Sequence, residues 1–130
     1  MRLLDHESGK ILLIALAGAA GTLARYWISG FVNRSTVAFP WGTITVNLLG
    51  CFLFGLVWVM AEERSLLSPV ARTVILIGFM GGLTTFSSLA GDTMGLLRDA
   101  QYLRAFANVA LQNTAGLALL WLGIVTGRAV

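Results

Sequence analysis

The chain has 130 residues, of which 57% are hydrophobic and only 12% are charged. A soluble domain carries roughly 25% charged residues, so this composition excludes a soluble enzyme or binding module and indicates an integral membrane protein. The formal net charge is +3, but the basic residues are spread over the ends of apolar segments and form no cluster. We therefore expect them to contact lipid headgroups and expect no nucleic-acid partner.

The apolar residues fall into four segments, each near the roughly 20 residues that a membrane-spanning helix needs. The predicted helices are Ile11–Phe31, Gly42–Met60, Pro69–Leu97 and Leu103–Thr126. Only short connections separate them. Residues 1–130 are therefore predicted to form a single all-α membrane domain of four transmembrane helices.

The first predicted helix places Gly18, Gly21, Thr22, Arg25 and Ser29 on one face at intervals of three and four residues. Small residues in this pattern let helices approach closely, so the face is expected to pack against protein. Two interpretations of the arginine stay open. Its guanidinium reaches the membrane interface, or it is a buried cation that stabilises the bundle or attracts anions.

The second predicted helix carries a lone amide near its middle. Thr43, Asn47 and Cys51 follow one another at four-residue intervals and so share a face. An asparagine in this position either joins helices through hydrogen bonds or lines a pore as a donor. The single cysteine has no partner for an intramolecular disulfide and is interpreted as a packing residue.

The third predicted helix contains an unfavourable segment, Gly81–Ser88, which reads GGLTTFSS. Glycine costs roughly 1 kcal/mol against alanine in a helix interior, and Ser and Thr compete for backbone hydrogen bonds. We expect the helix to stop near Met80 and to resume after this segment. Backbone groups freed at membrane depth are tolerated where protein buries them or water reaches them, so the interruption predicts an ion or water site. Exposed carbonyls at such a site suit a fixed cation.

The fourth predicted helix carries a polar stripe that includes Asn108, Gln112 and Thr114. The stripe either lines a hydrated path or joins subunits. A path lined by amides and hydroxyls, with almost no carboxylate, offers hydrogen-bond donors and therefore favours an anion. The ring edge of Phe86 adds positive partial charge.

Three segments resemble the Fluc, or CrcB, fluoride channels of bacteria. They are GAAGTLARYW (Gly18–Trp27), PWGTITVNLLG (Pro40–Gly50) and GFMGGLTTFSS (Gly78–Ser88), and the similarity covers nearly the whole chain. The resemblance implies a channel, not an enzyme, that exports fluoride passively through the bacterial inner membrane. It also implies an antiparallel homodimer with two fluoride pores and a structural Na⁺ at its centre. The nearly even division of basic residues between the two ends of the bundle agrees with insertion in both orientations.

The resemblance also implies roles for individual residues. Asn47 and Phe86 match positions that contact the permeating fluoride, and the backbone carbonyls of Gly81 and Thr84 match those that hold the sodium. Together with the polar residues described above, the predicted fluoride path comprises Thr43, Asn47, Phe86, Ser87, Ser88, Asn108, Gln112 and Thr114.

The chain departs from the family pattern at several positions. Leu89 stands where a second phenylalanine is usual, Gln112 and Gly116 stand where hydroxyl residues are common, and Asn108 stands where a tyrosine can occur. Asp92 falls where many members have a glutamate near the pore mouth. The conduction rate is expected to differ from that of better known members.

Two other functions fit a small four-helix membrane protein. A small multidrug-type proton-coupled exporter needs an intramembrane carboxylate, and the only candidate is Asp92, which lies toward a helix end. A non-transporting subunit of a larger assembly is the other alternative.

Overall fold

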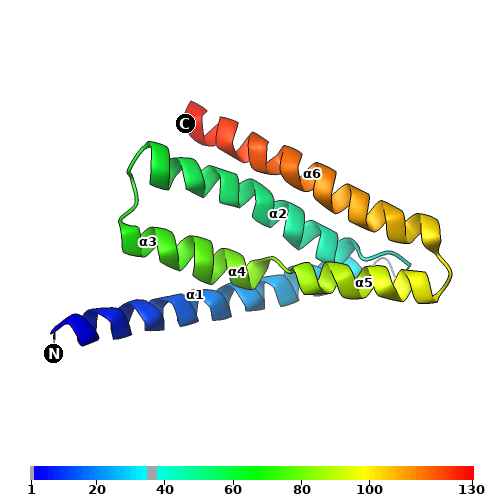
Figure 1. The fold of residues 1–130 in the computed structure, drawn as a ribbon, viewed down its shortest axis with the longest axis horizontal. Helices are drawn as coiled ribbons and strands as arrows, with labels where there is room; N and C mark the ends of the chain where they lie inside the picture. The colour runs from blue at the N-terminus through cyan, green and yellow to red at the C-terminus, as the bar shows by residue number, and fades with distance from the viewer. Residues whose placement is uncertain (1, 35–37) are drawn as a thin grey trace.

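The computed structural model describes residues 2–34 and 38–130, with side chains from Glu7 onward in the first range. Every regular element within these residues is a helix (Figure 1). In chain order they are α1 (Arg2–Asn33), α2 (Trp41–Trp58), η1 (Val59–Glu63), α3 (Pro69–Thr73), η2 (Val74–Phe79), α4 (Met80–Leu83), α5 (Phe86–Arg98) and α6 (Tyr102–Ala129). The two η elements are short π-helical segments that continue α2 and α3.

These elements form four helices that are long and apolar enough to cross a membrane, as predicted. The spans are Glu7–Asn33, Trp41–Glu63, Pro69–Arg98 and Tyr102–Ala129. The third span combines α3, η2, α4 and α5. In Figure 1 the start of α1, the end of α6 and the α2 to α3 connection lie at one end of the bundle, and the α5 to α6 turn lies at the other.

The second and fourth spans pack backbone to backbone. A Cβ atom added to Gly55 of α2 would lie 2.1 Å from the carbonyl oxygen of Leu120, and one added to Gly123 of α6 would lie 2.1 Å from that of Phe52. Each helix thus presents a glycine to a carbonyl of the other. Close approach of this kind is how membrane helices gain packing energy where the hydrophobic effect between them is weak. It brings the polar faces of α2 and α6 within hydrogen-bonding distance.

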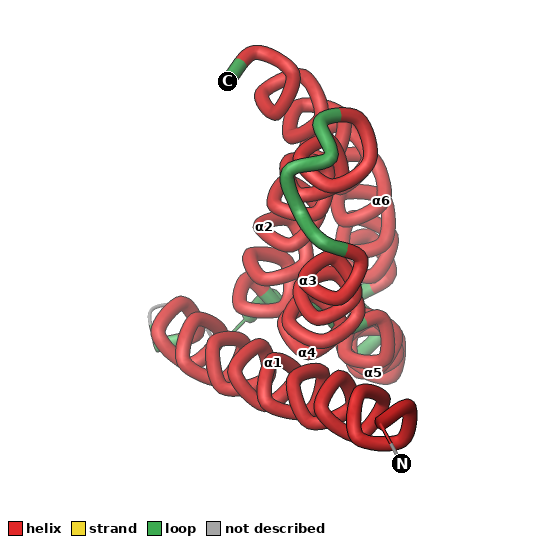
Figure 2. Tube along the Cα trace, turned by 90° about the vertical axis from the view of Figure 1, so that its left-hand side faces the viewer, coloured by secondary structure: helices red, strands yellow, loops and turns green. Residues whose placement is uncertain are grey.

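The first span crosses the third span before the interruption. Figure 2 shows α1 running obliquely past α3 and α4, which are seen nearly end-on. A Cβ atom on Gly21 would lie 2.1 Å from the carbonyl oxygen of Phe79, and one on Gly82 would lie 2.3 Å from that of Gly18. The predicted packing of the small-residue face of the first helix is confirmed at these glycines.

The third span is interrupted at Thr84 and Thr85, both of which have extended backbone. Their φ and ψ angles are −88° and 157° for Thr84, and −154° and 111° for Thr85. The predicted interruption is confirmed, but it is shorter than the predicted range Gly81–Ser88. Both glycines stay helical in α4, where Gly82 allows the close approach of α1, and residues 86–88 already form the first turn of α5.

Candidate functional site

Thr85 ends the interruption by capping α5. Its Oγ1 accepts a hydrogen bond from the Ser88 backbone N–H at 3.2 Å and donates to Ser88 Oγ at 3.0 Å. Ser87 Oγ lies within hydrogen-bond distance of the same atom, at 3.2 Å. A threonine in this position satisfies one of the N–H groups that a helix start leaves unpaired. Ser87 and Ser88 were predicted to line the pore; here they contact the cap, and their role toward an ion stays a prediction.

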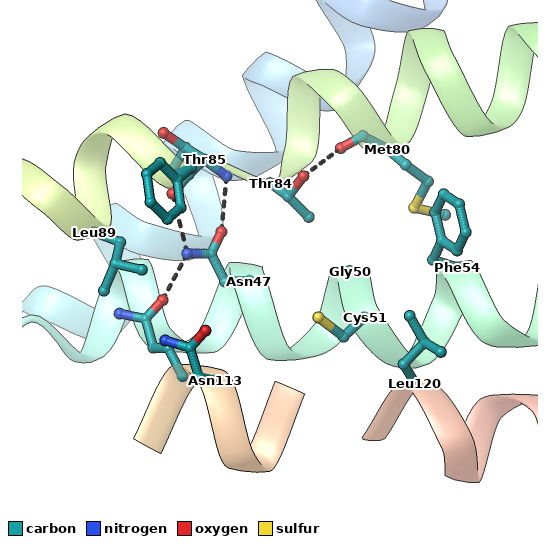
Figure 3. Close-up of a pocket in the computed structure, with 12 residues that line it drawn as sticks. Asn47, Gly50, Cys51, Phe54, Met80, Thr84, Thr85, Leu89, Asn113 and Leu120 are labelled. Atoms are coloured by element: carbon teal, nitrogen blue, oxygen red, sulfur yellow. Dashed lines mark hydrogen bonds between the residues drawn. The ribbon is translucent and has the colours of Figure 1, made fainter. Parts of the chain in front are cut away.

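Asn47 bridges the interruption from α2. In a continuous helix the Thr85 N–H would donate to the carbonyl of Gly81. Here it donates to Asn47 Oδ1 at 2.7 Å, and Asn47 Nδ2 donates to the Thr85 carbonyl oxygen at 3.1 Å (Figure 3). One side-chain amide therefore replaces the partners that two backbone groups lose at membrane depth, as buried backbone requires.

The second N–H of Asn47 Nδ2 is also occupied. It donates to Gln112 Oε1 of α6 at 2.6 Å. Gln112 is only 7% exposed, so this bond is shielded from solvent. The interhelical interpretation of Asn47 is thereby confirmed, and its contact with a permeating ion stays a prediction.

The hydrogen bonds continue from Gln112 toward α5. Gln112 Nε2 donates to Asn108 Oδ1 at 2.9 Å, and Asn108 Nδ2 donates to Thr93 Oγ1 at 2.9 Å. Thr93 Oγ1 in turn donates to the backbone carbonyl oxygen of Leu89 at 2.7 Å. Asn108 is 0% exposed. We call Asn47, Gln112 and Asn108 the amide row.

The direction of every bond in the amide row is fixed by its two ends. At one end the backbone N–H of Thr85 can only donate, and at the other the backbone carbonyl of Leu89 can only accept. Amide oxygen and nitrogen positions are assigned from such networks. Reversing any one amide would place donor against donor or acceptor against acceptor, so a single arrangement satisfies all members.

A cavity of about 370 Å³ lies beside the interruption. Its lining includes the polar groups of Asn47, Gln112 and Thr85, and the apolar side chains of Phe86 and Leu89 (Figure 3). The Phe86 side chain is 80% exposed in the single chain, whereas Leu89 is buried. The sequence-predicted residues Asn47, Phe86 and Gln112 are thus brought to one place.

A second, more polar recess of about 550 Å³ lies toward the end of the bundle that carries the α5 to α6 turn. Thr43, Asp92 and Arg104 contribute to its lining. Thr43 Oγ1 donates to Asp92 Oδ2 at 2.6 Å. Thr43 is one helical turn before Asn47, so the same face of α2 borders the recess and then the cavity.

Of the two predicted cation ligands, Gly81 lies within α4 and Thr84 directly follows it. Gly81 is exposed and helical, and Thr84 is half-buried and extended. The predicted ligands are backbone carbonyls, and within the described side chains no group of three or more His, Cys, Asp or Glu residues could hold a metal ion. The carbonyl of Gly81 fits that role, because the N–H that would bond it in a continuous helix is bonded to Asn47 instead.

Two other predicted site residues lie apart from the amide row. Arg25 is half-buried on α1, and both interpretations of its charge stay open. Thr114 is on the exposed face of α6, where its Oγ1 donates to the Ala110 carbonyl oxygen of its own helix at 2.7 Å. A pore role for Thr114 stays a prediction.

Thr85 and Thr93 are site residues that the sequence patterns did not single out. A signal existed for Thr85, because threonine is one of the residues preferred at the position just before a helix. Thr93 gave no such signal, since its role depends on how α5 and α6 pack.

The same arrangement can be compared with known proteins. A family model described as CrcB-like protein, Camphor Resistance (CrcB), matches residues 12–124. The chain belongs to the CrcB family. A protein from Solidesulfovibrio magneticus named fluoride-specific ion channel FluC is 54% identical to this CrcB chain over 122 residues, which is 93% of this chain and 98% of that protein. Proteins of the same name from Nitratidesulfovibrio vulgaris (Miyazaki F) and Nitrosococcus oceani are 49% and 48% identical with the same coverage. The resemblance found in the sequence is therefore confirmed at the level of the CrcB family.

Proposed function

We propose that this CrcB-family chain is a fluoride-selective ion channel that lets F⁻ leave the bacterial cytoplasm. The observation that carries the proposal is the identity of up to 54%, over nearly the whole chain, with proteins named fluoride-specific ion channels. Transport is passive and needs no chemical step. Fluoride that enters an acidified cell as HF dissociates inside, and a selective pore lets the anion leave down its gradient.

The chemistry of the described site supports an anion that has lost its water. A desolvated ion needs a replacement for each lost hydrogen bond. Asn47, Thr43 and Gln112 bring amide and hydroxyl groups to the α2 face that borders both cavities. Phe86 lies at the same cavity, and the edge of its ring carries positive partial charge.

We propose further that two copies pack antiparallel around a central Na⁺. Phe86 is 80% exposed and Gly81 is also exposed in the single chain, and a second copy would cover this side of the interruption. The carbonyls of Gly81 and Thr84 from each copy would hold the sodium. Bound there, the ion supplies a fixed positive charge that offsets the unfavourable energy of an anion in the membrane.

The proposal is tested with purified protein in liposomes loaded with fluoride and chloride. Ion-selective electrodes record the fluoride and chloride that leave the vesicles. We expect fluoride efflux, and no chloride efflux above that of protein-free vesicles. In Asn47→Asp a carboxylate would face the carbonyl oxygens of Thr85 and Gln112 without a donor and would repel the anion, so efflux is expected to stop. Equal fluxes of the two halides through the unsubstituted protein would contradict the proposal.

The same assay separates a channel from a proton-coupled exporter. An exporter would need Asp92, whose carboxylate accepts a hydrogen bond from Thr43 in the polar recess. In a channel, Asp92→Asn is expected to leave selective fluoride efflux and Asn47→Ala to impair it. Proton-driven transport that Asp92→Asn abolishes and Asn47→Ala spares would favour the exporter.

A further inference from the structure

We propose that the side-chain carbonyl of Gln112 is a tethered competitor that occupies a donor of Asn47 until an entering anion displaces it. This inference rests on the proposed fluoride channel and assigns Gln112 a role in its selectivity. Gln112 then acts through Asn47 as a positioning residue. This acceptor role of the Gln112 carbonyl is the opposite of the donor role that the sequence suggested.

Both N–H groups of Asn47 Nδ2 are engaged, so an anion gains this site only by replacing one partner. One partner is the Thr85 carbonyl oxygen at 3.1 Å, and the other is Gln112 Oε1 at 2.6 Å. The first is backbone, and Thr85 is buried and held at its own N–H by Asn47 Oδ1. The second sits at the end of a side chain with three rotatable torsions. Gln112 is therefore the partner that can move.

In this arrangement Gln112 presents its carbonyl oxygen, and not its nitrogen, to Asn47. Its Nε2 donates to Asn108 Oδ1, and Asn108 is fully buried with its own nitrogen on Thr93 Oγ1. Rotating the amide of Gln112 would set its nitrogen against the nitrogen of Asn47 and its oxygen against the oxygen of Asn108. The amide row thus holds an acceptor, and not a donor, against Asn47.

The competitor lies on the route between the two cavities. Thr43 borders the polar recess and Asn47, one turn along α2, borders the central cavity. An anion that follows this face of α2 from the recess arrives at Asn47 while its donor is bonded to Gln112. Passage into the cavity then requires exchange of one acceptor for another on the same N–H.

Exchange of this kind discriminates between anions by their strength as hydrogen-bond acceptors. Displacing Gln112 Oε1 leaves a shielded carbonyl without a partner, and this penalty is the same whatever the anion is. Fluoride is small and accepts strongly, so its bond to Asn47 offsets the penalty. Chloride is a weak hydrogen-bond acceptor, so its bond to Asn47 does not offset the penalty. A buried polar group left unpaired by the wrong ligand is an effective source of specificity.

The test compares the unsubstituted protein with Gln112→Met, which has similar volume but no strong acceptor. Initial fluoride and chloride fluxes into proteoliposomes are measured over a range of concentrations. We expect the fluoride concentration for half-maximal flux to fall about tenfold, as loss of one competing hydrogen bond predicts, and chloride flux to rise about tenfold. Gln112→Asn, whose shorter side chain cannot reach Asn47, is expected to change both quantities in the same direction.

The control for a general loss of stability is Val59→Ala. Val59 is fully buried in η1, near the opposite end of α2 from Thr43, and its truncation removes core packing without touching the amide row. Thermal unfolding in detergent is recorded for every variant. We expect Val59→Ala to leave the half-saturating concentration and the chloride flux unchanged.

The outcomes separate this inference from the proposed function. An unsubstituted protein without fluoride flux would defeat the proposed function itself. Fluoride flux in that protein, with unchanged saturation and chloride exclusion in both Gln112 variants, would overturn the competitor role alone. The competitor role would also be overturned if Val59→Ala reproduced the behaviour of the Gln112 variants, or if a folded Gln112→Met variant conducted no fluoride.

Discussion

Asn47 and Thr85 exchange two hydrogen bonds across the interrupted third span, at 2.7 Å from the Thr85 N–H and at 3.1 Å to its carbonyl oxygen. The two residues are 38 positions apart and belong to different spans. The extended backbone of the interruption is therefore stabilised by α2 as well as by its own segment. Removing the amide should affect the stability of the fold as well as transport.

The substitution Asn47→Leu keeps the branched shape of the side chain but removes its donors and acceptor. The Thr85 N–H, the Thr85 carbonyl and Gln112 Oε1 would all lose a partner. We expect the free energy of unfolding to fall by about 3 kcal/mol, since each buried unpaired group costs about 1–3 kcal/mol. Denaturant titration in detergent micelles measures the change.

The matched control for this substitution is Asn113→Leu. Asn113 is an exposed amide on α6 that donates only to the Val109 carbonyl oxygen of its own helix, at 2.8 Å. Its removal is expected to change stability by less than about 0.5 kcal/mol, as is usual for exposed positions. Equal losses in the two variants would show that Asn47 does not stabilise the interruption specifically.

The cap of α5 is tested by comparing Thr85→Val with Thr85→Ser. Valine keeps the branched shape but cannot accept from the Ser88 N–H, whereas serine keeps the oxygen. We expect a loss of about 1–2 kcal/mol for valine, the usual value of a capping side chain, and a smaller loss for serine. Hydrogen exchange of the amides in the first turn of α5 should accelerate only in the valine variant. Equal protection in both would contradict the capping role.

The turn between α5 and α6 contains an alanine in the left-handed region. Ala100 has φ of 56°, its N–H donates to the Leu97 carbonyl at 3.0 Å, and the Gln101 N–H donates to the Leu96 carbonyl at 2.8 Å. This pattern is the Schellman helix end, in which glycine is preferred. Ala100→Gly should therefore raise the free energy of unfolding by about 1 kcal/mol. Ala90→Gly, inside α5, should lower it by a similar amount, and a loss in both variants would contradict this account.

The contact between α2 and α6 predicts strong effects of small additions. In Gly123→Ala the new Cβ would lie 2.1 Å from the carbonyl oxygen of Phe52, where no atom fits without separating the helices. We expect less folded protein after purification and a lower unfolding temperature. Gly30→Ala serves as the control, because nothing lies within 4 Å of its added Cβ, and it should match the unsubstituted chain. An unfolding temperature unchanged by Gly123→Ala would show that the contact is looser than the structure indicates.

Much of the fold follows from composition and local chemistry. The four spans follow from runs of apolar residues of sufficient length, and the interruption follows from Gly81–Ser88, a segment that is poor at continuing a helix. The predicted interruption is longer than the observed one. Thr85 can start a new helix at once because its own side chain caps it, so two residues suffice to change direction.

The partners within the site were harder to predict. Periodicity places Asn47 on one face of α2 and Asn108 with Gln112 on one face of α6, and the structure brings these faces together. Which atom of each amide meets which neighbour depends on the relative rotation and height of the two helices. The rotation and height are set by close contacts such as those of Gly55 and Gly123. No local sequence pattern predicts these contacts. The place of Thr93 in the network could not be predicted for the same reason, since it depends on how α5 and α6 pack.

The fixed ends of the amide row also bear on protons. For a proton to hop along such a row, each member must release one hydrogen while accepting another and afterwards turn over to restore the starting state. Here the Thr85 N–H and the Leu89 carbonyl cannot turn over, and neutral amides do not readily gain or lose protons. The amide row therefore conducts no protons. An anion guided along it would cross without dissipating the pH gradient across the membrane.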